Sequence, residues 1–142
     1  MTDIAAVTDR LRQASGLAAV LDAACDGFED TLTVLWDHID PAEAMFISLL
    51  MAATCAADGR DAVLFAPSLP PHRRHAAPSA ETTPGPGSVG EVAGAVAGLC
   101  ELLASRLAEV AVGAADHGDQ AACHDAARYA RQIHDVLTGT SR

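Results

Sequence analysis

The segment from residue 4 to residue 39 reads IAAVTDRLRQASGLAAVLDAACDGFEDTLTVLWDHI. Its apolar residues recur at alternating spacings of three and four, which is the periodicity of one helical face. They are Ile4, Val7, Leu11, Ala14, Ala18, Leu21, Cys25, Phe28, Leu32, Leu35 and Ile39. Gly16 and Gly27 lie within the segment, but the spacing continues across both. The pattern therefore predicts one long helix with an unbroken apolar seam.

The composition of the whole chain favours helices as well. Its 142 residues include 31 Ala but only three Phe, one Trp and one Tyr. Ala is the best helix former, whereas strands favour β-branched and aromatic residues. Half of the residues are apolar, which is enough for one packed core and argues against disorder. We therefore expect a single, soluble, all-α domain over residues 1–142.

A second helix is expected after residue 39, because Asp40, Pro41 and Glu43 form a helix-capping signal. This helix is apolar on all sides, so we expect it to be the most buried element, with its end near Asp58 and Gly59. The run 62–66 fits either a last helical turn or a strand-like strip. The longest apolar run, residues 44–57, is shorter than the roughly 20 residues of a membrane span, so no membrane contact is expected.

The second half of the chain follows a proline-rich segment. Six of the seven prolines lie within residues 67–87, which predicts a flexible loop inside the domain. Ser88 and Glu91 then form a capping box for a helix from about residue 89 to residue 114, and a tight turn at residues 116–119 precedes a last helix. The sequence thus predicts a four-helix bundle of two antiparallel helical hairpins, joined by a long Pro/Gly-rich loop.

Charge and cysteine usage exclude several kinds of partner and site. A net charge of −10, with nine Arg and no Lys, would repel phosphate backbones, so we expect no nucleic-acid partner. The N-terminus lacks a basic segment followed by an apolar one, which predicts a cytoplasmic protein. No Cys-x-x-Cys pair occurs, and we expect reduced, buried thiols. Cys25 and Cys55 each lie 15 residues from Asp40, so a hairpin turning there would bring them to one height, either as apolar filler or as a thiol pair.

Motifs for catalysis and cofactor binding are absent from the sequence. It has no Glu-x-x-His motif for a carboxylate-bridged di-metal centre and no Gly-rich phosphate loop followed by Lys. Cys123 and His124 are consecutive, so on a helix their side chains point about 100° apart. We assign no catalytic, cofactor or metal residue and expect a non-enzyme, although a Cys or His with a partner on another helix is left open.

Two charged features are candidate partner-binding sites. Five acidic residues outside the seam of the first helix, with no basic residue four positions further on, form an acidic stripe that is either a solvated face or a surface for a basic partner. They are Asp22, Asp26, Glu29, Asp30 and Asp37. The segment His72-Arg73-Arg74-His75 is the only concentrated positive charge. Arg73 and Arg74 could fold back on the acidic stripe, contact an acidic partner, or do neither.

Two functions from different classes fit these observations. The predicted first helix is about twice as long as the second, so part of its apolar seam needs another cover. This predicts a homodimer through the first helix and a non-catalytic protein-interaction or regulatory module. The alternative is a small-ligand- or metal-binding helical bundle in which an apolar pocket lies between helices. Its lining would be Trp36, Met45, Phe46 and Met51.

Overall fold

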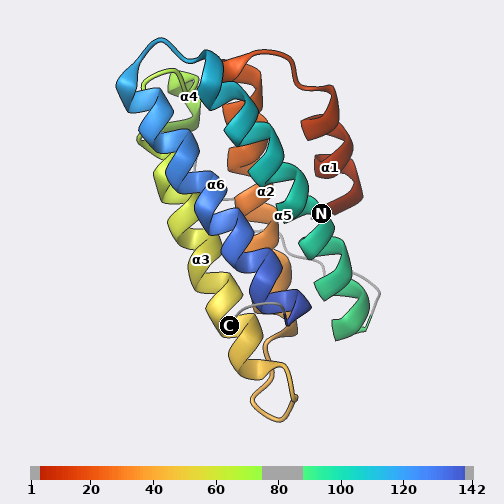
Figure 1. Ribbon diagram of the computed structural model, residues 1–142. Helices are drawn as coiled ribbons and strands as arrows, with labels where there is room; N and C mark the ends of the chain where they lie inside the picture. Colours follow the sequence, from red (N-terminus) through yellow and green to blue (C-terminus); the bar gives the residue numbers. More distant parts are fainter. Residues whose placement is uncertain (1–3, 75–87, 140–142) are drawn as a thin grey trace.

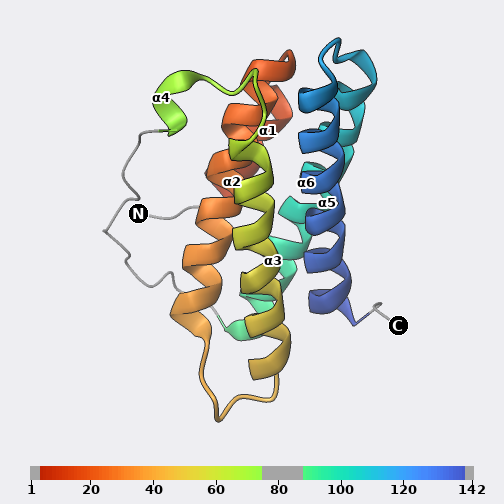
Figure 2. The same ribbon diagram turned by 90° about the vertical axis from the view of Figure 1, so that its left-hand side faces the viewer.

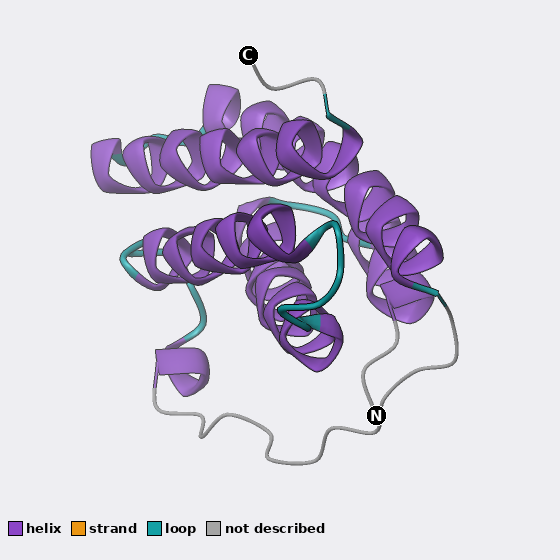
Figure 3. Cartoon of the chain, turned by 90° about the horizontal axis from the view of Figure 1, so that it is seen from below, coloured by secondary structure: helices purple, strands orange, loops and turns teal. Residues whose placement is uncertain are grey.

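The computed structural model describes residues 4–74 and 88–139. These residues form helices joined by loops (Figure 3). The helices are α1 (Ile4–Gln13), α2 (Leu17–His38), α3 (Phe46–Leu64), α4 (Pro71–Arg74), α5 (Val89–Gly113) and α6 (His117–Thr138) (Figure 1). The predicted all-α fold class is therefore confirmed.

The four long helices enclose the core. α2 and α3 are antiparallel neighbours, as are α5 and α6, and α3 also lies along α6 (Figures 1 and 2). Because many of the buried residues are Ala, the helix backbones approach closely around a few larger side chains. Among these larger side chains are Phe28, Leu49, Leu103 and Ile133, all with no exposed surface. α1 lies where α2 and α5 contact each other, and it covers that side of the bundle.

The prediction of one helix from residue 4 to residue 39 is wrong, because the chain reverses direction between α1 and α2. Gly16 has φ of 87°, in the left-handed region that side chains with a Cβ avoid, and it ends the helical path. α1 then lies antiparallel to α2, with Val7 and Leu11 buried (Figure 1). The Arg106 guanidinium of α5 donates to the carbonyl of Ala14 and so fixes the turn. The first part of the apolar seam is thus used inside the chain.

α3 begins and ends later than the capping signal predicts. Residues 40–45 form a turn in which the Asp40 carboxylate accepts from the backbone N–H of Ala42. The helix continues through Gly59, where the Phe28 ring packs so closely that a Cβ would lie only 2.4 Å from it. The ambiguous run at 62–66 begins in the last helical turn. α3 is also not buried on every side, since Ile47 and Met51 are more than half exposed.

The two later capping predictions are confirmed. The Ser88 hydroxyl accepts from the backbone N–H of Glu91 at 3.2 Å, at the start of α5. The Asp116 carboxylate accepts from the backbone N–H groups of Gly118 and Asp119 at the start of α6. Side-chain oxygens here satisfy amide groups that the first helical turn leaves without partners.

The first residues of the proline-rich segment pack on the bundle. Leu69 is buried, and Ser68 donates from its backbone N–H and its hydroxyl to the buried Asp119 carboxylate at 2.8 and 2.6 Å. α4 follows as a single helical turn, so residues 71–74 of the predicted flexible loop are helical. The remainder of the predicted flexible loop, residues 75–87, lies outside the described residues.

Candidate functional site

The negative charge of the protein is concentrated in one hairpin. Between Arg12 and Arg60 the sequence contains no Arg or Lys but eight acidic residues, so this span carries −8 of the net charge of −10. The eight are Asp22, Asp26, Glu29, Asp30, Asp37, Asp40, Glu43 and Asp58. The span contains all of α2, the turn at residues 40–45 and most of α3. Any cation that balances these carboxylates must therefore come from another part of the chain or from a partner.

At the end of the hairpin where α2 begins, the chain supplies these cations itself. Arg73 of α4 donates from Nε to Asp22 at 2.6 Å and from Nη2 to Asp26 at 2.7 Å. Arg10 of α1 also pairs with Asp26. Burial disfavours the Arg73 charge, but hydrogen bonds to Asp26 and Asp22 outweigh it and raise the pKa of this guanidinium. We call these four residues the ion-paired end.

Of the sequence alternatives for Arg73, the structure shows the one in which it folds back on the acidic stripe. The side chain of Arg74, its predicted companion, lies outside the described residues. Two further members of the stripe follow on α2. Glu29 accepts from the Cys25 thiol, and Asp30 is half-buried. Burial, together with the nearby charges of Asp26 and Glu29, raises the pKa of Asp30 to about 6. The carboxylates of Asp26, Glu29 and Asp30 in the middle of the acidic stripe therefore repel one another.

Three large apolar side chains are exposed at the opposite end of the same hairpin. Trp36 on the last turns of α2 is 55% exposed, and Ile47 and Met51 on the first turns of α3 are 60% and 52% exposed. Ile47 and Met51 are four residues apart and so share one helical face. Trp36 is nine residues from Gly27, about two and a half turns, and Gly27 packs against Leu103 of α5. Trp36 therefore faces away from α5. We call Trp36, Ile47 and Met51, which are exposed on two helices at this end of the hairpin, the hairpin-end surface.

This arrangement differs from the apolar pocket that the sequence suggested. Trp36 and Met51 are more than half exposed, and Met45 and Phe46 are half-buried. All four side chains therefore keep part of their surface exposed.

Three acidic residues lie at this same end of the hairpin. Asp37 follows Trp36 directly, and Asp40 and Glu43 lie in the turn that joins α2 to α3. All three are exposed, and no ion pair joins any of them to another residue in the described ranges 4–74 and 88–139. Both ends of the hairpin thus carry negative charge, but within the described residues Arg side chains pair only with the end where α2 begins.

The four cysteines are free and poorly nucleophilic. Burial is the main cause that raises the pKa of each thiol, to about 12 for Cys25 and about 11 for Cys123. The predicted neighbours Cys25 and Cys55 have different surroundings, since Cys25 contacts Glu29 of its own helix whereas Cys55 contacts Gln132 of α6 at 3.6 Å. Cys55 instead lies within electrostatic reach of Cys100. Within the described part of the chain, no three His, Cys, Asp or Glu side chains are grouped to hold a metal ion.

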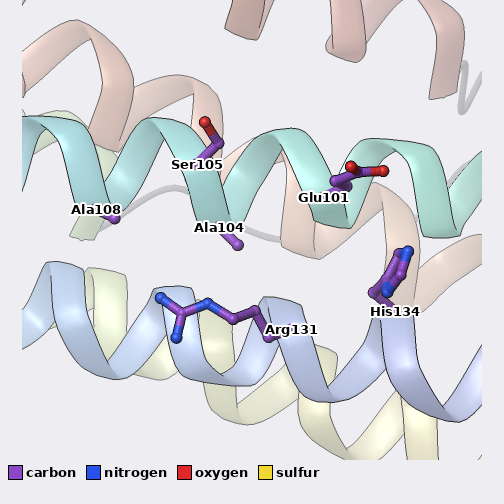
Figure 4. A pocket seen from close by; sticks show the side chains of 6 residues that line it. All are labelled: Glu101, Ala104, Ser105, Ala108, Arg131 and His134. Carbon is purple, nitrogen blue, oxygen red and sulfur yellow. The ribbon is translucent and has the colours of Figure 1, made fainter. Parts of the chain in front are cut away.

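A shallow site that the sequence analysis missed lies between α5 and α6. It is a pocket of about 300 Å³ lined by four residues of α5 and two of α6 (Figure 4). They are Glu101, Ala104, Ser105, Ala108, Arg131 and His134. The two alanines leave room between the helices, and charged side chains of both signs lie beside that space (Figure 4). The small residues at positions 104, 105 and 108 were the available sequence signal, but their facing residues on α6 could not be identified from spacing alone.

Comparison with known proteins adds no family to this description. No family model matches the chain, and neither the curated proteins nor the solved structures contain a similar protein at the level searched. Among the helices of the described residues, none combines the length and apolar character needed to cross a bilayer.

Proposed function

We propose that this chain is a non-catalytic, cytoplasmic protein-interaction module that binds a partner protein through the hairpin-end surface. The exposure of Ile47 and Met51, which share one face of α3 at the hairpin end, and of Trp36 near the end of α2 carries this proposal, because exposed apolar patches mark interaction sites. Trp is also among the residues that contribute most to binding at protein interfaces. The raised thiol pKa values favour a role without covalent catalysis.

The homodimer predicted through the first helix rested on an uncovered apolar seam. That seam is covered within the chain, because Leu11, Leu21, Phe28 and Leu35 have no exposed surface. The reason for placing a dimer interface there is therefore gone. Dimerisation stays a prediction, and light scattering at high protein concentration tests it by distinguishing 14.6 kDa from twice that mass.

Affinity capture from the source organism tests the proposed binding surface. The bait is the wild-type chain, the double variant Ile47→Asp/Met51→Asp, or Val112→Asp as a matched control. Val112 is 86% exposed but lies on α5, so the control adds a charge to an exposed apolar position elsewhere. We expect a protein that the wild type and Val112→Asp recover and the double variant does not. Equal recovery by all three baits would contradict the proposal, with circular dichroism showing that each bait is folded.

The pocket between α5 and α6 supports a second candidate function, the binding of a small zwitterionic molecule. Glu101 and Arg131 offer opposite charges beside a space of about 300 Å³, which is at the lower limit for small-molecule sites. A thermal-shift screen of free amino acids and similar zwitterions tests it. The expected result is a rise of several degrees that Arg131→Ala removes and Arg128→Ala, a neighbouring exposed site, retains. No rise with any such compound would exclude this candidate.

A further inference from the structure

Residues 66–74, which follow α3 and include α4, are attached to the bundle at two points, and we call them the strap. The first attachment is to α6. Asp119, in the first turn of α6, is only 2% exposed and accepts from the backbone N–H and the hydroxyl of Ser68 at 2.8 and 2.6 Å. Pro67 packs against Gly118, where a Cβ would lie 3.0 Å from the proline ring. Because a buried carboxylate without hydrogen bonds is unfavourable, α6 holds Ser68 in place.

The second attachment of the strap is to α2. Arg73 donates to Asp22 at 2.6 Å and to Asp26 at 2.7 Å, and only 18% of its side chain is exposed. α2 and α6 belong to different helical hairpins. In Figure 2, α4 lies on the α2 side of α3, and α6 lies on the other side. The strap therefore connects the two hairpins across the end of α3.

The residues between the two attachments form a stiff unit. The backbone N–H of Leu69 donates to the carbonyl of Ala66 at 3.1 Å, and the backbone N–H of Arg73 donates to the carbonyl of Pro70 at 3.0 Å. Pro70 and Pro71 lie between these two turns, and the ring of each proline fixes its φ angle. A stiff segment transmits a displacement at one end to the other end. The attachments at α6 and α2 should therefore be coupled.

The strap buries little apolar surface compared with the bundle. Its buried large side chain is Leu69, whereas Pro67, Ser68 and Pro71 are exposed. Each of the four long helices instead buries several residues in the common core. Segments with few buried apolar contacts open at a lower free energy than the core does. The strap should therefore be able to open while the four long helices stay folded.

From these observations we infer that the strap is a reversible link between the two hairpins, which opens and closes as one unit. In the closed state it joins α2 to α6. Opening releases Ser68 and Arg73 together and leaves Asp119 and Asp26 without these donors. Asp26 keeps its pair with Arg10, because Arg10 belongs to α1 and lies outside the strap. This inference is separate from the proposed partner binding, because the link acts within one chain.

Amide hydrogen exchange followed by NMR, at low urea concentrations, tests the link. The backbone N–H of Ser68 reports on the attachment to α6, and the Nε–H of Arg73 reports on the attachment to α2. Both should exchange through the same opening, at rates that hardly depend on urea, because a local opening exposes little surface. The backbone N–H groups of Leu103 and Ile133 in the core should exchange more slowly and respond strongly to urea.

Salt provides a test of the coupling in the wild-type chain. Raising NaCl from about 0.05 to about 0.5 M screens the ion pairs of Arg73. The hydrogen bonds from Ser68 to Asp119 come from uncharged donors and are not ion pairs. We therefore expect exchange of the Ser68 N–H to accelerate with salt by the same factor as exchange of the Arg73 Nε–H.

Two arginine variants separate the strap from general electrostatics. Arg73→Gln and Arg10→Gln are matched, because each removes one positive charge that pairs with Asp26. Arg73→Gln should accelerate exchange of the Ser68 N–H about fivefold, although Arg73 is bound to a different helix from Ser68. Arg10→Gln should leave this exchange unchanged or slow it, because the two guanidinium groups on Asp26 repel each other. Ser68→Ala should in turn accelerate exchange at the Arg73 Nε–H.

Three results would overturn the inference. Exchange of the Ser68 N–H that is unchanged in Arg73→Gln and at high salt would mean that the two attachments are independent. Exchange of the wild-type Ser68 N–H with the rate and urea dependence of Leu103 and Ile133 would mean that the strap opens only when the bundle unfolds. Equal acceleration by Arg10→Gln and Arg73→Gln would assign the effect to the charge of Asp26 and not to the strap.

Discussion

The two ends of the α2–α3 hairpin have similar charge and different surroundings. At the ion-paired end, Arg10 and Arg73 from neighbouring helices neutralise Asp22 and Asp26. At the opposite end, Trp36, Ile47 and Met51 are exposed, and no ion pair joins Asp37, Asp40 or Glu43 to another residue in the ranges 4–74 and 88–139. Within the described residues, arginines pair with the carboxylates of the first end only, which assigns that end a structural role, and we propose that the second end is the one that binds a partner.

The largest expected effect tests whether the hairpin-end surface rests on a rigid core. Leu49 lies between Ile47 and Met51 on α3 but has no exposed surface. Leu49→Asp should reduce the free energy of unfolding by about 4 kcal/mol or more, because it buries an unpaired charge. Ile47→Asp, two residues away and exposed, should change it by less than about 0.5 kcal/mol. Urea unfolding followed by circular dichroism measures both, and similar effects of the two changes would show a loosely packed end.

A smaller effect is expected where the middle of the hairpin is packed most closely. A Cβ at Gly59 would lie 2.4 Å from the Phe28 ring. Gly59→Ala should therefore lower the free energy of unfolding by about 2 kcal/mol, since the ring must move. Gly98→Ala on α5, where a Cβ meets no atom within 4 Å, should instead stabilise by up to about 1 kcal/mol. Urea unfolding should give changes of opposite sign in the free energy of unfolding for the two variants. Destabilisation by both would mean that position 98 also contacts a neighbour.

The ion-paired end should contribute about 1 kcal/mol to folding, in line with partly exposed salt bridges. Arg73→Ala removes the partner that Asp22 and Asp26 share, whereas Arg128→Ala removes a surface pair with Asp125 at 3.7 Å. The first change should destabilise measurably and the second hardly at all. At about 0.5 M NaCl the difference should shrink, because salt screens such pairs. Wild-type stability of the Arg73→Ala variant at low salt would contradict a structural role for the ion-paired end.

The smallest expected effect is a change in the pH dependence of stability. The pKa of Asp30 is raised to about 6 in the folded protein, from an ordinary value of 3.8. Between these two values the folded state binds more protons at this site than the unfolded state, so the contribution of Asp30 to stability falls as pH rises from about 4 to about 6. Asp30→Asn should remove this loss. The Tm of the variant minus the Tm of the wild type should therefore be larger at pH 7 than at pH 4.5. Thermal unfolding at both values measures the difference, and an equal Tm offset at the two pH values would contradict it.

The sequence predicted those parts of the fold that local chemistry determines. Ser88 and Asp116 act as helix caps through hydrogen bonds to residues only two or three positions away, and both were predicted correctly. The break at Gly16 was missed because the apolar spacing continues across it, and a reversal of the chain preserves that spacing. Gly59 lies within α3 where the Phe28 ring of another helix leaves no room for a Cβ, so this glycine serves packing and is not the helix end that local sequence signals predicted.

The candidate site was predictable only in part, for a related reason. The acidic stripe and the charge of Arg73 were visible in the sequence, but their pairing joins residues about 50 positions apart. Trp36 and Met51 were predicted to line an interior pocket, because apolar residues are expected inside, but both are more than half exposed. The exposure of Met51 depends on which face of α3 packs against α6. Tertiary packing determines that face, and the sequence spacing alone does not.

The central claim is that the hairpin end, and no other surface, binds a partner protein. Backbone amide NMR of the labelled protein, titrated with the partner recovered by affinity capture, maps the contact residue by residue. The account predicts that the largest chemical-shift changes fall at Trp36, Ile47 and Met51 and in residues 37–43, with small changes at Asp22 and Asp26. Changes centred on the ion-paired end, or on Glu101, Arg131 and His134 between α5 and α6, would contradict it.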